Sequence, residues 1–464
     1  MLILKKGLVF CATLVAAAII SFGFGGRARS ESSGLSWQDT NKLLSLNSVW
    51  VSRGYGIVWQ IQNGRSREYE ISGQYCIFVE EEPGPPDSAA PRMLLDPKKS
   101  ILRVGVADGI GYLHIFDRRN SLPAPCRKRP DASPAGVFNA VDQIFTHRYA
   151  FFEKRKIDWR SRVRDFRPRL SSVKTDEALF DLLEALLMPI GDEHISLRGY
   201  VDGENRYFSP DRKLIAKPAR LPATSRLPGI WSSAAANRLL GPRAKQNASG
   251  SIVYGMLDKE IGYLGIRSFW WRRVRDLGPT LDKALDLFQR AKIVIVDVSS
   301  NGGGSERFAK RVAERFAKKP TIGLFKYAGD AKGAKPQPIH LIPSRGKRFL
   351  GPTYVISNAE TFSAAETLVL YMGALENVTH IGRPTGGALS DVLTRKLPNG
   401  WRLGLSNEVY LDAKGRAWEG IGIPPKIELK VESDEKRFTV RDLTAARQAL
   451  AAIRAHAIKA LPKD

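Results

Sequence analysis

The sequence has few of the residues that build metal sites. It contains 3 cysteines and 6 histidines in 464 residues. The pattern H-E-x-x-H, which binds zinc in metalloproteases, does not occur, and so few cysteines cannot form a structural zinc site by themselves. We therefore expect neither a metal nor another cofactor.

Motifs for nucleic-acid binding are also missing, although the formal net charge is +25. The basic runs, such as KRKID, RSRVRDFRPR and PSRGKRF, are scattered along the chain without zinc ligands, a base-stacking motif or a recognition-helix pattern. We interpret them as a solvated basic surface and expect no nucleic-acid partner. Association with an anionic cell surface is the alternative. The oligomeric state is not predictable from these features.

The N-terminus has the pattern of an export signal. Lys5 and Lys6 precede an apolar run over residues 7–24, and small residues follow up to a possible cleavage site at Ala28. We expect residues 1–28 to be a signal peptide that directs the protein to the periplasm or the outside of a bacterium. An uncleaved membrane anchor is the alternative, because the apolar run could just span a bilayer.

An exported chain can form disulfides, and two cysteines remain once the signal is removed. Cys11 would leave with the signal, whereas Cys76 and Cys126 stay in the mature chain. They are candidates for one disulfide, which fits an oxidising compartment. The sequence does not decide the pairing, because it gives no distance between them.

The remaining chain divides into segments of different periodicity. Residues 35–125 alternate apolar and polar positions between Asn-Gly and Pro-Gly turns, which predicts a small antiparallel β domain. Residues 135–200 have the spacing of amphipathic helices and end in the D-x-H element Asp192 to His194. Residues 201–250 show little periodicity and are predicted to be a connector or lid.

Buried strands then alternate with helices over residues 251–432, which indicates an α/β core in a protein that is α+β overall. The spacing of apolar residues over 433–464 predicts a final amphipathic helix. In the core, the strand IVIVDVSS leads into a turn with Gly303 and Gly304, where backbone amides could bind an anion or an oxyanion. A tight strand-to-helix turn is the simpler interpretation of that stretch alone.

The stretch NAETFSAAETL places a serine at the start of a predicted helix. Ser363 and Glu366 have the spacing of a capping box. A serine in this place also has the amide of Ala364 beside its hydroxyl, which is the arrangement that acyl transfer needs. By itself the pattern S-x-x-E favours a cap.

The order of four motifs along the chain indicates more than any one of them alone. VDVSSNGGG, NAETFSAAE, IGRPTGGALSD and the run from LPNGWRLGL to GIGIPPKIEL occur in the order found in the C-terminal-processing (tail-specific) serine peptidases, and the chain resembles that family over residues 252–432. Tricorn core protease and interphotoreceptor retinoid-binding protein belong to the same wider group. The resemblance implies a crotonase-like ββα core, a protein or peptide substrate, and Ser363 as the nucleophile.

The general base is where the sequence departs from the processing peptidases. Their catalytic lysine would stand at Ala388, and Lys396 is further along the chain. In tricorn-like members a histidine and a glutamate act instead, which implies His194 as the base and Glu419 as the carboxylate that orients it. Other acidic residues near the motifs stay open for the second role: Glu366, Asp391 and Glu408.

The predicted function is that of an exported serine-type peptidase with an oxyanion hole made by the amides of Ala364 and Gly303, with Gly304 as the alternative donor. The segment between Leu197 and Ser251 is too short for the PDZ domain of the processing peptidases, so C-terminal specificity is not expected to carry over. Two other functions stay open. One is a binding protein for an apolar ligand or peptide on the same scaffold, and the other is a Ser-Lys enzyme that uses Lys396.

Overall fold

The structure is a computed structural model. It describes residues 36–37, 47–83, 92–96, 98, 100–105, 112–210, 240–299, 301–329, 335–429 and 450–456. The predicted signal, residues 1–28, and most of the predicted C-terminal helix lie outside these ranges. None of the helices within them is long and apolar enough to span a membrane.

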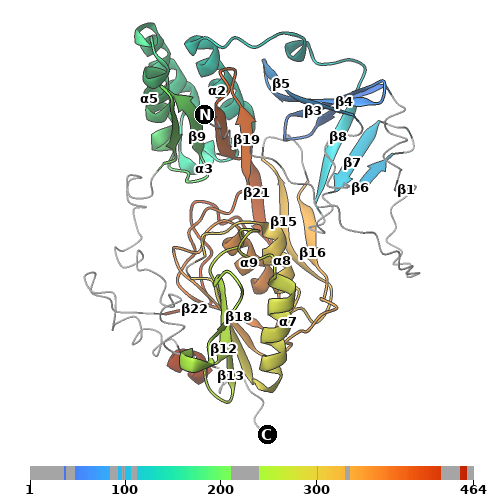
Figure 1. Cartoon of the computed structure of the whole chain (residues 1–464), viewed down its shortest axis with the longest axis vertical. Helices are drawn as coiled ribbons and strands as arrows, with labels where there is room; N and C mark the ends of the chain where they lie inside the picture. The colour runs from blue at the N-terminus through green and yellow to red at the C-terminus, as the bar shows by residue number, and fades with distance from the viewer. Residues whose placement is uncertain are drawn as a thin grey trace, which may run out of the picture.

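The N-terminal part is an antiparallel sheet, as the alternating pattern predicts (Figure 1). Asn63 and Gly64, both with positive φ, form the tight turn between its strands β3 and β4. The strand order is β1-β6-β7-β8-β2-β3-β4-β5. The bounds are β1 Ser36–Trp37, β2 Ser48–Ser52, β3 Ile57–Gln62, β4 Arg65–Ser72, β5 Tyr75–Pro83, β6 Arg92–Leu95, β7 Ile101–Gly105 and β8 Leu113–Arg119.

A disulfide joins this sheet to the segment that follows it. Cys76 on β5 is bonded to Cys126 in the short helix η1, Ala124–Arg127, with the two Cα atoms 4.9 Å apart. The pairing that the sequence left open is therefore present. Both cysteines are buried in a small cluster with Val58 and Tyr69.

The helical segment lies beside the sheet and forms a core of its own (Figure 1). Thr175 caps α5 by accepting a hydrogen bond from the Ala178 amide, and the acidic residues Asp176 and Glu177 in its first turn suit the helix dipole. The helices are α2 Pro134–Arg148, α3 Phe152–Arg155, α4 Trp159–Phe166, η2 Arg167–Ser172, α5 Asp176–Leu187 and η3 Met188–Ile190.

One pairing differs from the expected division of the chain. Strands β19, Val392–Lys396, and β20, Arg402–Ser406, follow the core motifs in sequence but pair with β9, Ser196–Val201, in a sheet of order β10-β9-β20-β19. Leu403 and Leu405 are buried against the helical segment because this face of β20 packs on it. Strand β10, Glu204–Phe208, also shows that the start of the predicted connector is a hairpin, whereas residues 211–239 lie outside the described ranges.

The core is a mixed sheet of order β11-β12-β13-β14-β17-β18-β22, parallel from β13 onward. Helices α7, α8 and α9 pack on one face, and residues 450–456, which are helical, pack on the other. The bounds are η5 Gly241–Arg243, β11 Lys245–Gln246, β12 Ile252–Met256, β13 Ile261–Ile266, α7 Leu277–Leu287, η6 Phe288–Arg290, β14 Ile293–Asp297, α8 Glu306–Ala313, β17 Thr353–Ser357, α9 Ala364–Gly373, β18 Val378–Gly382 and β22 Ile427–Glu428.

A further antiparallel sheet of order β16-β15-β21 reaches from the core toward the N-terminal parts (Figure 1). Its strands are β15 Thr321–Ala328, β16 Gln337–Leu341 and β21 Glu408–Asp412. The predicted α/β core, helical segment and small β domain are thus confirmed as the fold class. The crotonase-like assignment that the resemblance implies stays a prediction.

Candidate active site

Ser363 lies at the turn that joins β17 to α9. Its φ of 55° and ψ of −125° are rare for a residue with a side chain, and such strain is common at functional turns. The Ser363 amide donates to the Ala388 carbonyl oxygen at 3.0 Å and to Oε2 of Glu366 at 3.3 Å. The predicted capping box is present, and it holds Ser363 in this conformation at the wall of a cavity.

The carboxylate of Glu366 does more than cap the helix. Its Oε1 accepts hydrogen bonds from the Thr385 hydroxyl at 2.6 Å and the Gly387 amide at 2.7 Å, and its Oε2 accepts from the Ala388 amide at 2.7 Å. The side chain is fully buried, so these donors replace the water that the carboxylate loses. Glu366 therefore ties the turn with the sequence GRPTGGA to the start of α9.

Two backbone amides beside Ser363 are free to act as oxyanion donors. Within the described part of the chain, the amides of Ala364 and Gly304 donate to no acceptor, as is usual for the first residue of a helix such as Ala364. The Gly303 amide instead donates to Oδ1 of Asn301 at 2.8 Å. This bond favours Gly304, the alternative donor, over Gly303.

Gly303 nevertheless needs to be glycine. Its φ is 92°, and a Cβ built there would lie 2.7 Å from the Ser363 Cβ and 3.1 Å from the Ala364 nitrogen. The absence of a side chain at Gly303 keeps the space in front of Ser363 and the Ala364 amide open.

His194 lies between η3 and β9, at the end of the predicted D-x-H element. Its ring packs against Phe362, the residue before Ser363, with 4.9 Å between ring centroids. His194 and Ser363 line the same cavity, but no hydrogen bond joins them in this structure, and Nδ1 of His194 has no partner. Burial lowers the pKa of His194. The charge of Arg155 lowers this pKa further, and the charge of Asp192 opposes the change. The ring is therefore neutral at neutral pH and able to accept a proton.

Glu419 is buried near this site but does not contact the His194 ring. Its Oε2 accepts from the amides of Leu389, at 2.7 Å, and Ser390, at 3.0 Å, and its Oε1 accepts from Arg155 at 3.1 Å. The pKa of Glu419 is raised to about 8, mainly by burial. The negative charge of Asp192 raises this pKa further, whereas the positive charge of Arg155 lowers it. The resemblance implied that Glu419 orients the His194 imidazole. In the structure, Glu419 instead accepts hydrogen bonds from backbone amides of the turn beside Ser363.

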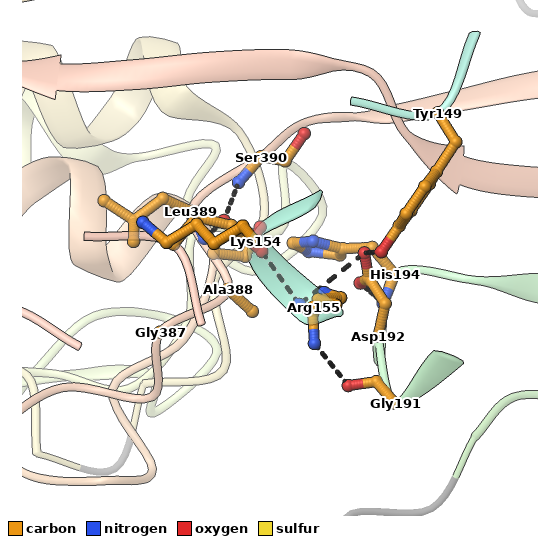
Figure 2. A network of polar contacts seen from close by, with 12 residues as sticks. Tyr149, Lys154, Arg155, Gly191, Asp192, His194, Gly387, Ala388, Leu389 and Ser390 are labelled. Atoms are coloured by element: carbon orange, nitrogen blue, oxygen red, sulfur yellow. Dashed lines mark hydrogen bonds and ion pairs between the residues drawn. The ribbon is translucent and has the colours of Figure 1, made fainter. Parts of the chain in front are cut away.

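Arg155 is the residue of this site that the sequence did not indicate. It belongs to the run KRKID, which we interpreted as solvated surface, yet its side chain is only 14% exposed. The guanidinium donates to the Gly191 carbonyl at 2.5 Å and lies 3.6 Å from Asp192, in addition to its bond with Glu419 (Figure 2). The apolar pair Phe151 and Phe152 just before this run was a signal that could have identified it.

Arg155 connects the two halves of the candidate site. Asp192, which it contacts, accepts the backbone N–H of His194 at 3.0 Å and the hydroxyl of Tyr149 at 2.9 Å (Figure 2). Glu419, which it also contacts, holds the turn whose Ala388 carbonyl accepts the Ser363 amide. A single guanidinium thereby joins the His194 loop to the turn beside Ser363.

In the part of the chain that the structure describes, neither Ala388 nor Lys396 supplies a lysine base at Ser363. Ala388, where the resemblance implies the lysine of the processing peptidases, is buried against Ser363. Lys396 ends β19, where its amide donates to Glu70 and its carbonyl accepts from Tyr75 of the N-terminal sheet, and it does not line the cavity. Lys326 lines the cavity, but it is paired with two carboxylates.

The cavity has a volume of about 760 Å³ and lies between the N-terminal sheet, the end of the helical segment and the core. Ser363, His194 and the Gly304 turn form one region of its wall, and Tyr55, Tyr112 and His114 of the N-terminal sheet contribute another. Within the described residues no group of three or more His, Cys, Asp or Glu side chains could hold a metal ion. The arrangement is that of an acyl-transfer site with a serine, a neutral imidazole and unpaired amides.

Comparison with known proteins supports a peptidase. Residues 260–429 match the model of peptidase family S41, and residues 130–188 match the tricorn protease C1 domain. A crystal structure of a Parabacteroides merdae protein described as a peptidase is similar at 26% identity, with a TM-score of 0.57 over 70% of this chain and 97% of that one. Mature CPAF complexed with lactacystin has a similar fold at 12% identity, with a TM-score of 0.54 over 71% of this chain and 99% of that one. No curated protein matches the chain.

Proposed function

We propose that the protein is an exported serine peptidase that forms an acyl-enzyme on Ser363, and the premise is the match of residues 260–429 to the model of peptidase family S41. The observation that carries the proposal is the strained Ser363 turn at the start of α9, with the unpaired Ala364 amide beside it and His194 on the same cavity wall. Such a turn presents a nucleophile and an oxyanion donor on consecutive residues.

The proposed reaction has two steps. In the first, Ser363 Oγ attacks the scissile carbonyl carbon, His194 takes the hydroxyl proton, and the proton passes to the leaving amine as the peptide C–N bond breaks. In the second, a water molecule loses a proton to His194 and attacks the acyl carbon, and the proton returns to Ser363 Oγ as the ester bond breaks. The ring of His194 closes on Ser363 when substrate binds, since catalytic hydrogen bonds often form only in the complex.

The developing oxyanion is stabilised by the amides of Ala364 and Gly304. Both donors are fixed by the backbone before substrate arrives, so little reorganisation accompanies the reaction. Glu419 has a positioning role in this proposal: with Arg155 it fixes the turn at Leu389 and Ser390, next to the carbonyl that holds the Ser363 amide.

Export to the periplasm or the cell exterior is part of the proposal. The predicted signal at residues 1–28 supports it, as does the disulfide between Cys76 and Cys126, because disulfides persist mainly in oxidising compartments. The substrate we propose is a protein or peptide. The alternative is a binding protein for an apolar ligand, and the apolar side chains of the cavity wall, such as Trp270, Trp271 and Leu389, are the observation that favours it.

Labelling with a serine-reactive phosphonate tests the proposal. We expect the wild type to be labelled and to lose peptide hydrolysis, whereas Ser363→Ala is not labelled and His194→Ala is labelled far more slowly. Ser305→Ala removes another hydroxyl of the same cavity and is expected to keep the label. Label that persists in Ser363→Ala would contradict the nucleophile, and unchanged labelling of His194→Ala would contradict the base.

A further inference from the structure

The cavity that contains Ser363 also contains charged side chains that the proposed reaction does not use. Lys326 on β15, Glu306 at the start of α8, Glu408 on β21 and Asp391 before β19 all line it. They come from separate segments of the core, and the sequence indicated only Asp391 and Glu408, as acidic residues near the motifs.

The lysine of this group is already paired. Lys326 Nζ lies 3.1 Å from Oε2 of Glu306, 3.1 Å from Oε2 of Glu408 and 3.3 Å from the Tyr410 hydroxyl. Burial alone would lower the pKa of Lys326, but Glu306 and Glu408 outweigh it and raise the pKa, so the ammonium keeps its proton. It has no donor left for a substrate carboxylate.

The two glutamates are saturated as well. Oε1 of Glu408 accepts the Tyr55 hydroxyl at 2.5 Å, and Oε1 of Glu306 accepts the Tyr371 hydroxyl at 2.5 Å. Every oxygen of these two carboxylates therefore has a donor within the protein, and the group is a closed network with one ammonium for two carboxylates.

Asp391 is different. Its side chain is open to the cavity, and its Oδ1 accepts the neighbouring Val392 amide at 2.8 Å. In the part of the chain that the structure describes, Asp391 has no ion pair with a lysine, arginine or histidine. Desolvation in the cavity raises the pKa of Asp391, and the Glu408 charge adds to this effect while Lys326 opposes it; the exposure of the side chain limits the change. At neutral pH Asp391 is thus an anion without a counter-ion.

Apart from Lys326, the described residues of the cavity wall include no side chain that is a cation at neutral pH. Burial lowers the pKa of His114 to about 4, so its imidazole is neutral at neutral pH, as is that of His194. Trp270 at the cavity wall is 64% exposed, and its indole can pack against the apolar stem or the planar head of a basic side chain.

From this geometry, and resting on the proposed peptidase function, we infer that Asp391 is a specificity-determining residue that binds a cationic group of the substrate. The group is the side chain of a lysine or arginine residue or a free N-terminal ammonium, because all of these supply the positive charge and the N–H donors that the Asp391 carboxylate lacks. The cavity places this carboxylate in the same space as Ser363, three residues after the Ala388 carbonyl that holds the Ser363 amide.

Matched fluorogenic peptides test the inference. One series carries arginine or its neutral isostere citrulline at each position in turn, and a second compares a free with an acetylated N-terminus. We expect kcat/KM to favour the charged form in one of the two series by about tenfold or more, the effect of roughly one well-formed ion pair. Asp391→Asn keeps the side-chain size and the acceptor for the Val392 amide, and we expect it to reduce this ratio to near one.

The pH dependence adds a second readout. The preference of the wild type should shrink as the pH falls through the raised pKa of Asp391, since the carboxyl group then becomes neutral. Asp181→Asn, a change in an exposed carboxylate on α5, should leave the preference unchanged. Cleavage without any preference for charge, or a preference that survives in Asp391→Asn, would overturn the inference alone. A wild type that cleaves no peptide would overturn the proposed function and the inference with it.

Discussion

The two halves of the candidate site are built in different ways. The Ser363 turn is fixed by a network of short-range bonds within the core, in which Glu366 holds the amides of Ser363, Gly387 and Ala388. The His194 loop depends instead on Arg155, which comes from the helical segment. The nucleophile is therefore held by backbone geometry, and the base is held by charges that join distant parts of the chain.

The largest expected effect is the loss of either reacting group. Ser363→Ala and His194→Ala should each reduce kcat by about 10⁴-fold or more, and the double variant should lose no more than either one, because the two residues act as a unit. Steady-state hydrolysis of a fluorogenic peptide measures this. His340→Ala, an exposed histidine on β16, serves as control. A His194→Ala enzyme within tenfold of wild type would show that the two halves do not work together.

The next effect concerns Arg155, which joins the His194 loop to the turn beside Ser363. Arg155→Met leaves the Asp192 carboxylate buried without its cation and removes a hydrogen bond from Glu419, so we expect the free energy of unfolding to fall by about 3 kcal/mol. Arg155→Lys should restore part of the loss, since it keeps the charge but makes fewer directed hydrogen bonds. Denaturant titration at fixed pH gives both values.

A surface pair provides the control for Arg155. Arg53 and Asp117 form an ion pair in which the arginine is 48% exposed, and Arg53→Met should cost less than about 1 kcal/mol. Equal losses in Arg155→Met and Arg53→Met would mean that the Arg155 network contributes no more than an ordinary surface pair.

A third change addresses the Ser363 half alone. In Gly303→Ala the added Cβ meets the Ser363 Cβ and approaches the Ala364 nitrogen, so we expect kcat to fall by about 10²-fold, the usual cost of losing an oxyanion donor. Gly302→Ala is the matched control, because a Cβ there meets no atom within 4 Å. A Gly303→Ala enzyme as active as Gly302→Ala would show that the space in front of Ser363 is not used.

A further effect is a pH dependence of stability at Glu419, which holds the turn beside Ser363 and contacts Arg155. The pKa of Glu419 is raised from 4.5 to about 8 in the folded protein, so the folded state binds more protons than the unfolded state between these values. Its contribution to stability is present below pH 4.5 and is lost as the pH rises through about 8, with a slope of at most about 1.4 kcal/mol per pH unit. Thermal unfolding of the wild type and Glu419→Gln across this range should show a steeper fall of stability with pH in the wild type, because the other shifted groups are the same in both proteins. The same slope in both would assign it to another group.

The Ser363 half could be predicted from the sequence because each of its parts is a recognisable local pattern. The spacing of Ser363 and Glu366, the glycine turn and the buried strands before them are local patterns, and all are present in the structure. The disulfide candidates were visible too, although their pairing needed the fold. The role of His194 as base was implied by the resemblance, and the break from helix to extended chain that follows it was the local signal.

The parts of the site and the fold that the sequence did not predict depend on contacts between segments that are distant in the chain. Arg155 looks like one of many basic residues until α3 brings it between Gly191 and Glu419. The bonds of Glu419 with Leu389 and Ser390 depend on how a late loop folds back on the core. Likewise, the Lys326 network and the pairing of β20 with β9 join residues that no periodicity connects.

The central claim is that Ser363 is the nucleophile, and the site of a covalent adduct tests it most directly. After reaction with a serine-reactive phosphonate and digestion, tandem mass spectrometry should find one adduct per chain, on the peptide that contains Ser363. An adduct on any other residue, or none in an enzyme that the reagent inactivates, would contradict the account.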